Sequence, residues 1–294
     1  MEQTKVPQSA LRFLATAQQD LKAARCLHEN GYYPQAVFYL EQSVEKGLKS
    51  YSITLGIIDE SEARREISHK TLKIYEKSTK NFRQRVVTLQ ENLKKIPQLE
   101  NFFNQQVNFA EILGQRDHAL DQIHTLLKQD IGSLRLTQEE LNKHITSLQD
   151  LHREAQREKS KIQSRPITPS EFRKYKRSIV NMLRAAIPND PEKIKQANEE
   201  LNRDFTFETY EKIMKDAITR YVPPIEVFQS LLPLSIILQS HAVARYPAPD
   251  FVPLEFYTPD LPLIKSFSKL ADITERVLNQ VDEIYQNAEG RSVS

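Results

Sequence analysis

The chain has 294 residues, 27% of them charged, and a formal net charge of +2 at pH 7. Six glycines and no tryptophan are typical of long helices and unfavourable for a sheet protein with many turns. No apolar run approaches the roughly 20 residues that span a bilayer, so we expect no membrane segment. The first residues lack the charged-then-apolar layout of a signal peptide. The single cysteine, Cys26, excludes an intrachain disulfide and favours a cytoplasmic location.

Residues 13–51 predict two helices joined by a tight turn. Apolar or small residues line one face of the first helix, at Leu14, Ala17, Leu21, Ala24 and Leu27. Asn30-Gly31 supplies the stop, because glycine tolerates the left-handed conformation that ends many helices. Pro34 suits the first turn of the second helix, where its missing N–H costs nothing. Gly47 costs that helix roughly 1 kcal/mol of propensity, which predicts close approach by another helix.

The second helix also carries a charged face, formed by Glu41, Glu45, Lys46 and Lys49. Glu45 and Lys49 are one helical turn apart, so we expect an i,i+4 ion pair. The spacing alone is typical of a solvated helix face.

Three groups of residues occur in an order and spacing that resemble one known family. The first comprises Asp20-Leu21, Ala24, Gly31-Tyr32, Pro34, Ala36, Gln42, Val44-Glu45-Lys46 and Leu48-Lys49. The second comprises residues 241–247, Tyr257-Thr258 and a closing helix over 261–285; the third is Ser68-His69 followed by Leu72. Together they resemble the HEPN family of small helical domains. The resemblance implies an all-α, up-and-down HEPN-like helical bundle built from residues 8–81 and 225–288.

Residues 82–224 separate the two parts of this bundle and are themselves expected to be helical. Capping-box sequences at Thr137–Glu140 and Thr168–Glu171 mark two helix starts. Apolar stripes before and after the first of these boxes predict antiparallel helices that pack as a hairpin or short coiled coil. A further helix around Phe207 is expected to end at Pro223-Pro224. We therefore expect a large helical insertion subdomain.

One segment of the insertion is strongly basic. The segment from residue 153 to residue 177 contains nine lysines and arginines but only three glutamates. Phe172 and Tyr175 are interleaved, which would place stacking surfaces beside phosphate-binding charge. A solvated helix face and loop is the alternative interpretation. The candidate residues for RNA or nucleotide binding here are Arg173, Lys174, Lys176 and Arg177.

The resemblance implies further candidate residues. Enzymatic HEPN proteins are metal-independent ribonucleases with an Arg followed after four to six residues by a His; the Arg stabilises charge on phosphate and the His moves the proton of a ribose 2′-OH. Only Arg64 and His69 have this spacing, at a position where many family members carry a structural histidine. In the expected place the order is reversed, with His241 before Arg245, which argues against nuclease activity.

The candidate catalytic residues are therefore His69, His241 and Arg245. Arg245 and Tyr246 are also candidates for ligand binding, although an Arg at a helix C-terminus has a structural explanation in the helix dipole. The resemblance further suggests that Glu45, Lys46 and Lys49 lie near a groove for nucleotide or RNA.

Three functions stay open. The first is a non-catalytic, homodimeric RNA- or nucleotide-binding protein of a toxin–antitoxin or defence-type system, for which the resemblance implies a nucleotidyltransferase-type partner. The second is a metal-independent endoribonuclease toxin, and the third is a helical scaffold that binds a protein partner through the insertion. No Gly-rich phosphate loop, dinucleotide fingerprint or zinc-ligand spacing is present, so we expect no cofactor and no metal.

Overall fold

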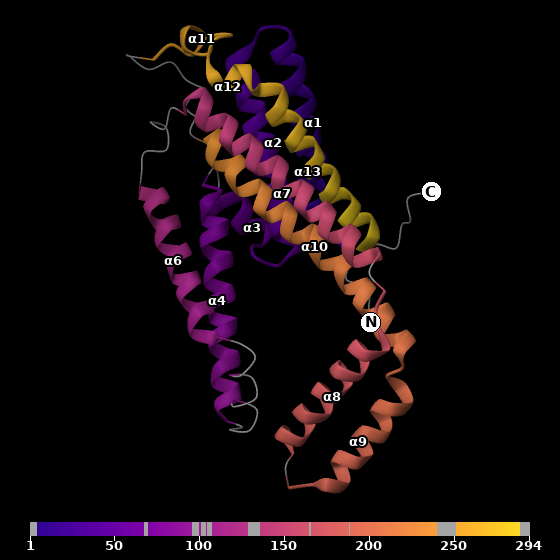
Figure 1. Ribbon diagram of the computed structural model, residues 1–294. Coiled ribbons are helices and arrows are strands. Elements are labelled where there is room, and N and C mark those ends of the chain that lie inside the picture. The colour runs from indigo at the N-terminus through magenta and orange to yellow at the C-terminus, as the bar shows by residue number, and fades with distance from the viewer. Residues whose placement is uncertain are drawn as a thin grey trace. The chain divides into compact units, whose positions relative to one another are not determined.

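A computed structural model describes residues 5–67, 70–95, 100, 104, 108–128, 136–164, 166–187, 189–239 and 251–288. These residues form an all-α fold, as predicted, with one π-helical turn and no strand among them. The elements are α1 Gln8–Glu29, α2 Tyr33–Thr54, α3 Glu60–Glu62, the π-helix Ala63–Ile67, α4 Leu72–Lys94, α6 Phe109–Lys128, α7 Gln138–Ser164, α8 Pro169–Ala186, α9 Pro191–Asp204, α10 Phe207–Gln239, α11 Pro253–Phe256, α12 Pro262–Lys265 and α13 Phe267–Ala288 (Figure 1).

The chain divides into two compact units. Unit 1 comprises Met1–Ser78, Gln122–Gln156 and Val222–Ser294, and unit 2 comprises Thr79–Asp121 and Arg157–Tyr221. Helices α4, α6, α7 and α10 each continue from one unit into the other. The predicted division, with an insertion over 82–224, stays a prediction; the contacts of residues 122–156 lie in unit 1.

The α1–α2 hairpin forms as the sequence predicts. Helix α1 stops before Asn30, and Gly31 takes the left-handed conformation, with φ of 79°. Pro34 lies in the first turn of α2. The apolar face of α1 is buried against α2, with Leu14 and Leu21 almost fully excluded from solvent. Burying such side chains contributes about 1.5–3 kcal/mol each.

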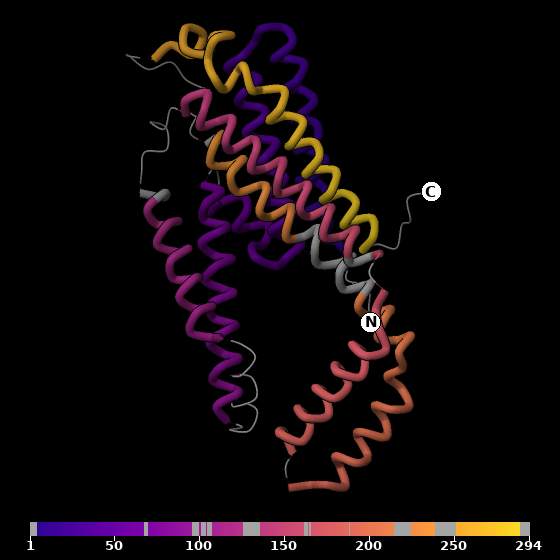
Figure 2. Tube along the Cα trace, viewed as in Figure 1, coloured from indigo at the N-terminus to yellow at the C-terminus, as the bar shows by residue number. Residues whose placement is uncertain are grey.

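Helix α13 returns from the far end of the sequence to pack against both α1 and α2, as the C-terminal and N-terminal colours show in Figure 2. A Cβ atom at Gly47 would lie 2.6 Å from Leu278 Cδ2 on α13. The predicted close approach at Gly47 is therefore confirmed. One turn further along α2, the Ser50 and Tyr285 hydroxyls are 2.9 Å apart, and Thr54 Oγ1 donates to Tyr285 Oη at 2.8 Å.

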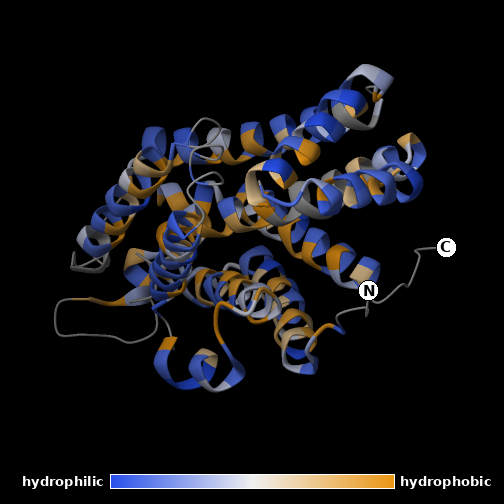
Figure 3. Cartoon of the chain, turned by 90° about the horizontal axis from the view of Figure 1, so that it is seen from below, coloured by the Kyte–Doolittle hydropathy of each residue, from blue (hydrophilic) through white to orange (hydrophobic). Residues whose placement is uncertain are grey.

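Helices α7 and α10 complete the core of unit 1. The Thr137–Glu140 capping box is confirmed, with the Glu140 N–H donating to Thr137 Oγ1 and the Thr137 N–H to the Glu140 carboxylate. The α7 and α10 side chains that join this core are Leu141, Ile145, Leu148, Val227, Leu231, Leu234, Ile237 and Leu238. Figure 3 shows helices of the chain divided into hydrophobic and hydrophilic faces. That division is the pattern expected of helices with one buried side.

One helix end was predicted wrongly. Helix α10 does not end at Pro223-Pro224 but continues to Gln239. A proline inside a helix lacks the N–H for one backbone hydrogen bond and crowds the carbonyl four residues earlier, but packing elsewhere in the helix can offset this cost. Tyr210 is buried before the prolines and Val227 after them, so burial stabilises the helix on both sides of this weak point.

Two side-chain contacts join α4 to α6 in unit 2. Arg83 Nε on α4 lies 2.6 Å from Asp117 Oδ1 on α6. The Arg116 guanidinium lies over the Phe82 ring, 4.7 Å from its centroid. Phe82 and Leu89 nevertheless stay nearly half exposed, whereas Leu93 is buried. Part of the apolar stripe predicted before the first capping box is therefore accessible to solvent.

We expect Gly47→Ala to destabilise the protein by about 1 kcal/mol in chemical unfolding. The added methyl group overpacks against Leu278, at a cost of about 1–3 kcal/mol, and a gain of roughly 1 kcal/mol in helix propensity offsets part of it. Gly114→Ala is the matched control, because this exposed α6 position has nothing within 4 Å of the new Cβ; it should be stabilising. Equal effects of the two substitutions would contradict the close-packing account.

The buried tyrosines predict loss of stability at alkaline pH. Burial, and secondarily Tyr285, raise the pKa of Tyr51 well above its ordinary value, and burial raises the pKa of Tyr285 too. The unfolded chain ionises its tyrosines at a pKa of about 10, so the free energy of unfolding should fall as pH rises above that value. The Tyr51 hydroxyl has no hydrogen-bond partner among the described residues.

Urea unfolding of Tyr51→Phe at pH 8 and pH 10.5 tests this account. The variant should match the wild type at pH 8, because no described hydrogen bond is lost, and should lose less stability at pH 10.5. Tyr32→Phe at an exposed position is the control and should decline as the wild type does. A decline in Tyr51→Phe equal to that of the wild type would show that Tyr51 does not contribute.

Candidate functional site

The polar face of α2 is buried, so its interpretation as a solvated face is wrong. Glu41 and Glu45 are each 4% exposed and Lys49 is 5% exposed. The reason is the central place of α2, which packs against α1, α13 and α11. Periodicity counts the apolar residues of a helix but does not show how many neighbours surround it.

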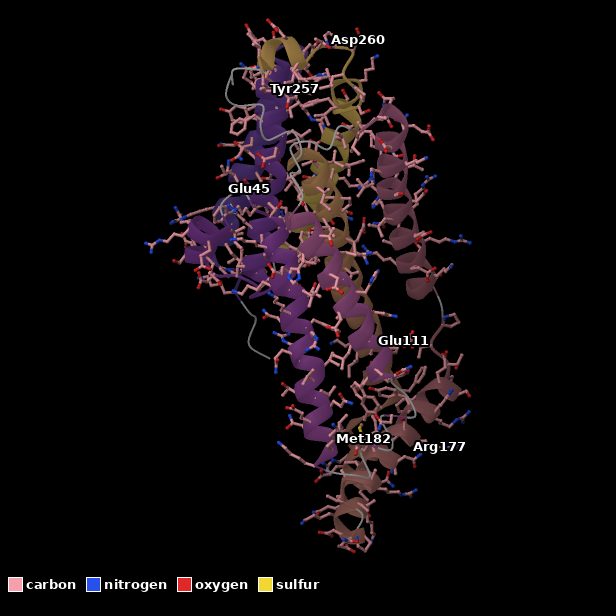
Figure 4. The ribbon with its side chains drawn as sticks, turned by 90° about the vertical axis from the view of Figure 1, so that its left-hand side faces the viewer. Glu45, Glu111, Arg177, Met182, Tyr257 and Asp260 are labelled. Atoms are coloured by element: carbon pink, nitrogen blue, oxygen red, sulfur yellow. The ribbon has the colours of Figure 1, made fainter. Side chains whose placement is uncertain are left out.

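Hydrogen bonds join the buried polar side chains of α2. Lys49 Nζ lies 2.6 Å from Glu45 Oε1, which confirms the expected i,i+4 pair. Gln42 Nε2 donates to Glu45 Oε2 at 3.2 Å and to Glu41 Oε2 at 2.9 Å. Both Glu45 oxygens (Figure 4) are therefore engaged within α2 itself. Because buried charges are costly unless they are paired, this arrangement lets α2 keep polar residues inside the bundle.

Lys46, the third predicted ligand-binding residue of α2, pairs with Asp20 of α1. Asp20 is itself largely buried, and a second polar contact between the two helices lies close by, where Ser43 Oγ donates to the Ala17 carbonyl at 2.8 Å. The charges of Glu45, Lys46 and Lys49 thus contribute to packing within unit 1.

A second buried polar cluster joins three helices. Glu226 of α10 is 3% exposed, and its Oε1 lies 2.5 Å from His152 Nδ1 of α7. Arg276 of α13 donates to the Leu148 carbonyl at 3.4 Å. Burial lowers the pKa of the Arg276 guanidinium, and the nearby Glu226 carboxylate raises it. No local motif indicates this cluster in the sequence, because its members are separated by 50 residues or more.

The aromatic residues of the basic segment pack within unit 2. Phe172 of α8 lies near Phe205, Phe207 and Tyr210, with ring centroids 5.5–5.8 Å apart. Tyr175 lies 5.1 Å from Tyr210 in a tilted arrangement. Such contacts are typical of a small aromatic core. The prediction that Phe172 offers a stacking surface for bases therefore lacks support from the geometry.

The basic residues of α8 divide into one that is engaged and three that are exposed. Lys176 lies over the Phe172 ring, 5.3 Å from its centroid, and donates to the Phe205 carbonyl at 3.4 Å. Arg173, Lys174 and Arg177 are exposed, and none forms an ion pair with another described residue. Arg177 and Met182 lie on different sides of α8 (Figure 4), as expected of an amphipathic helix.

The candidate catalytic residues come from two segments of the sequence, around residue 69 and over residues 241–246. His69, His241 and Arg245, together with Tyr246, lie outside the described residues. Arg64, which has the ribonuclease spacing to His69, is exposed and pairs with Glu60 at 2.8 Å on the same helical segment. Among the described residues, no cluster of three or more His, Cys, Asp or Glu side chains is arranged to hold a metal ion. None of the described helices is both long and apolar enough to cross a membrane.

Residues 10–105 match the family model of the HEPN domain. The match spans the α1–α2 hairpin and continues beyond α4, and it confirms the resemblance that the residues of this hairpin carry. No curated protein and no solved structure matches the chain.

We expect Lys49→Ala to lower the free energy of unfolding by about 3 kcal/mol, because it leaves a buried Glu45 carboxylate without its cation. Lys143→Ala is the matched control: Lys143 pairs with Glu139 at the same i,i+4 spacing, but both side chains are more than 70% exposed. Its loss should cost less than about 0.5 kcal/mol. The double variant Glu45→Gln, Lys49→Met should recover most of the stability; similar losses in the two single variants would contradict the buried-pair account.

Proposed function

Because the chain contains a HEPN domain at residues 10–105, we propose that the protein binds RNA or a nucleotide without cleaving it. In this proposal it acts as a homodimer in a toxin–antitoxin or defence-type system, with a nucleotidyltransferase-type partner protein. The dimer, the system and the partner rest on the family resemblance alone.

The observation that carries the proposal is the exposed positive charge of α8. The charges of α2, inside the HEPN domain, are buried or paired with neighbours. Arg173, Lys174 and Arg177 are exposed without ion-pair partners among the described residues. Exposed Lys and Arg attract phosphates and release bound counterions, which drives non-specific nucleic-acid binding.

The absence of cleavage is supported by the sequence order and by Arg64. An Arg that stabilises a phosphodiester transition state needs a guanidinium that is free to meet the phosphate. Arg64 donates through both Nε and Nη2 to one oxygen of Glu60, at 3.1 and 2.8 Å. In the segment where the family motif is expected, His241 precedes Arg245 instead of following it.

Fluorescence anisotropy with labelled single-stranded RNA in EDTA tests the proposal. We expect intact RNA and a dissociation constant of about 1–100 μM near physiological salt; unlabelled ATP in the same assay tests whether a nucleotide competes. Cleavage that is lost in His69→Ala or His241→Ala would instead identify a metal-independent ribonuclease. Absence of binding to both RNA and nucleotide would leave the scaffold function. Light scattering on the same sample reports whether the protein is a dimer.

A further inference from the structure

One helix of unit 2 carries a charge pattern that helix stability does not explain. We propose that α8 binds the phosphate backbone of RNA through Arg173, Lys174, Arg177 and Arg184, without selecting the bases. The inference rests on the proposed function and specifies its ligand class: a polynucleotide held by its phosphates, whatever its sequence.

The four basic side chains lie on one face of α8. At about 100° per residue, an angle that follows from 3.6 residues per turn, they fall within an arc of roughly 100°. All four are exposed. The distance along the axis from Arg173 to Arg184 is about 16 Å, at a rise of 1.5 Å per residue. A row of positive charges of this length, interrupted between Arg177 and Arg184, is suited to a linear polyanion.

This basic strip is costly to the helix that carries it. Arg173 and Arg177 are an i,i+4 pair of like charge, which destabilises a helix by a few tenths of a kcal/mol. No acidic residue follows Glu171 in α8 to offset these charges. Only Arg184, in the last turn, has a favourable place relative to the helix dipole.

Several surface charges of α7 and α9 are offset by neighbours of opposite charge. Ion pairs within α7 join Lys143 to Glu139, Arg153 to Asp150, and Lys161 to Glu158. At the start of α9, Lys193 pairs with the N-cap residue Asp190. The contrast indicates that the α8 face is arranged for an external anion and not for its own stability. The phosphate groups of a polynucleotide would supply the missing negative charge.

The geometry also argues against selection of bases. Binding of single strands through their bases uses aromatic side chains as stacking platforms. Phe172 and Tyr175 instead pack with Phe205 and Tyr210 on the opposite side of α8 from the basic strip, where Tyr175 stays 47% exposed. Lys176, at the border of the strip, is engaged with the Phe172 ring and the Phe205 carbonyl. Arginine and lysine contacts to phosphate fix position but carry no sequence information.

The salt dependence of RNA binding by Arg177→Gln, Arg184→Gln tests the inference in the full chain. The slope of log affinity against log salt should become shallower by about 1.4, since each lost phosphate contact to a single strand contributes about 0.7. At 0.1 M salt this corresponds to an affinity weaker by up to about 25-fold. The control is Lys193→Gln, Arg203→Gln, which removes the same number of charges from residues paired with Asp190 and Asp204 on α9; its slope should match the wild type.

The outcomes separate this inference from the proposed function. If the wild type binds RNA but the α8 variant keeps the wild-type slope, the α8 assignment is overturned and RNA binding stands. A preference of more than about tenfold between poly(U) and poly(A) would overturn the absence of base selection. If the wild type binds no RNA, the proposed function itself fails; binding to anionic lipid vesicles in that case would assign the strip to a membrane surface. Circular dichroism shows whether each variant remains helical.

Discussion

The fold of unit 1 depends on the contact between α2 and α13. Gly47 lets Leu278 approach the α2 backbone, and Tyr285 bonds Ser50 and Thr54 one to two turns further along. This contact closes a helical bundle by joining α2 to α13, which lie more than 200 residues apart in the sequence. It also explains the buried polar residues of α2, because a helix enclosed by α1 and α13 has little surface left for solvent. Glu45 and Lys49 are tolerated there only as a pair.

Much of the fold was predictable because its signals are local. The Gly31 turn, the Pro34 start and the capping boxes at Thr137 and Thr168 depend on a few neighbouring residues, and the structure confirms each of them. Two expectations failed for a different reason. The burial of Glu45 and the continuation of α10 through Pro223-Pro224 are decided by tertiary packing, which local propensity and periodicity do not contain.

The same distinction applies to the candidate site. The basic strip of α8 was predictable, since Arg173 and Arg177 lie close in sequence, but its separation from Lys176 and Phe172 depends on packing against α9 and α10. The cluster of His152, Glu226 and Arg276 was not predictable, because it joins three helices that only the fold brings together. The basic strip in unit 2 is therefore a local pattern, whereas the polar cluster in unit 1 depends on contacts that no window of sequence contains.

The burial of α13 against α2 means that the segment matched to the HEPN domain is smaller than the unit that folds. Residues 10–105 end long before Phe267, Leu278 and Tyr285, which cover the inner side of the matched helices. A fragment cut at these limits would expose to water the side of α2 around Gly47 that Leu278 and Tyr285 of α13 cover. Such a fragment would aggregate or bind unrelated apolar surfaces. Exchange of this segment between proteins would therefore succeed only if a substitute for α13 came with it.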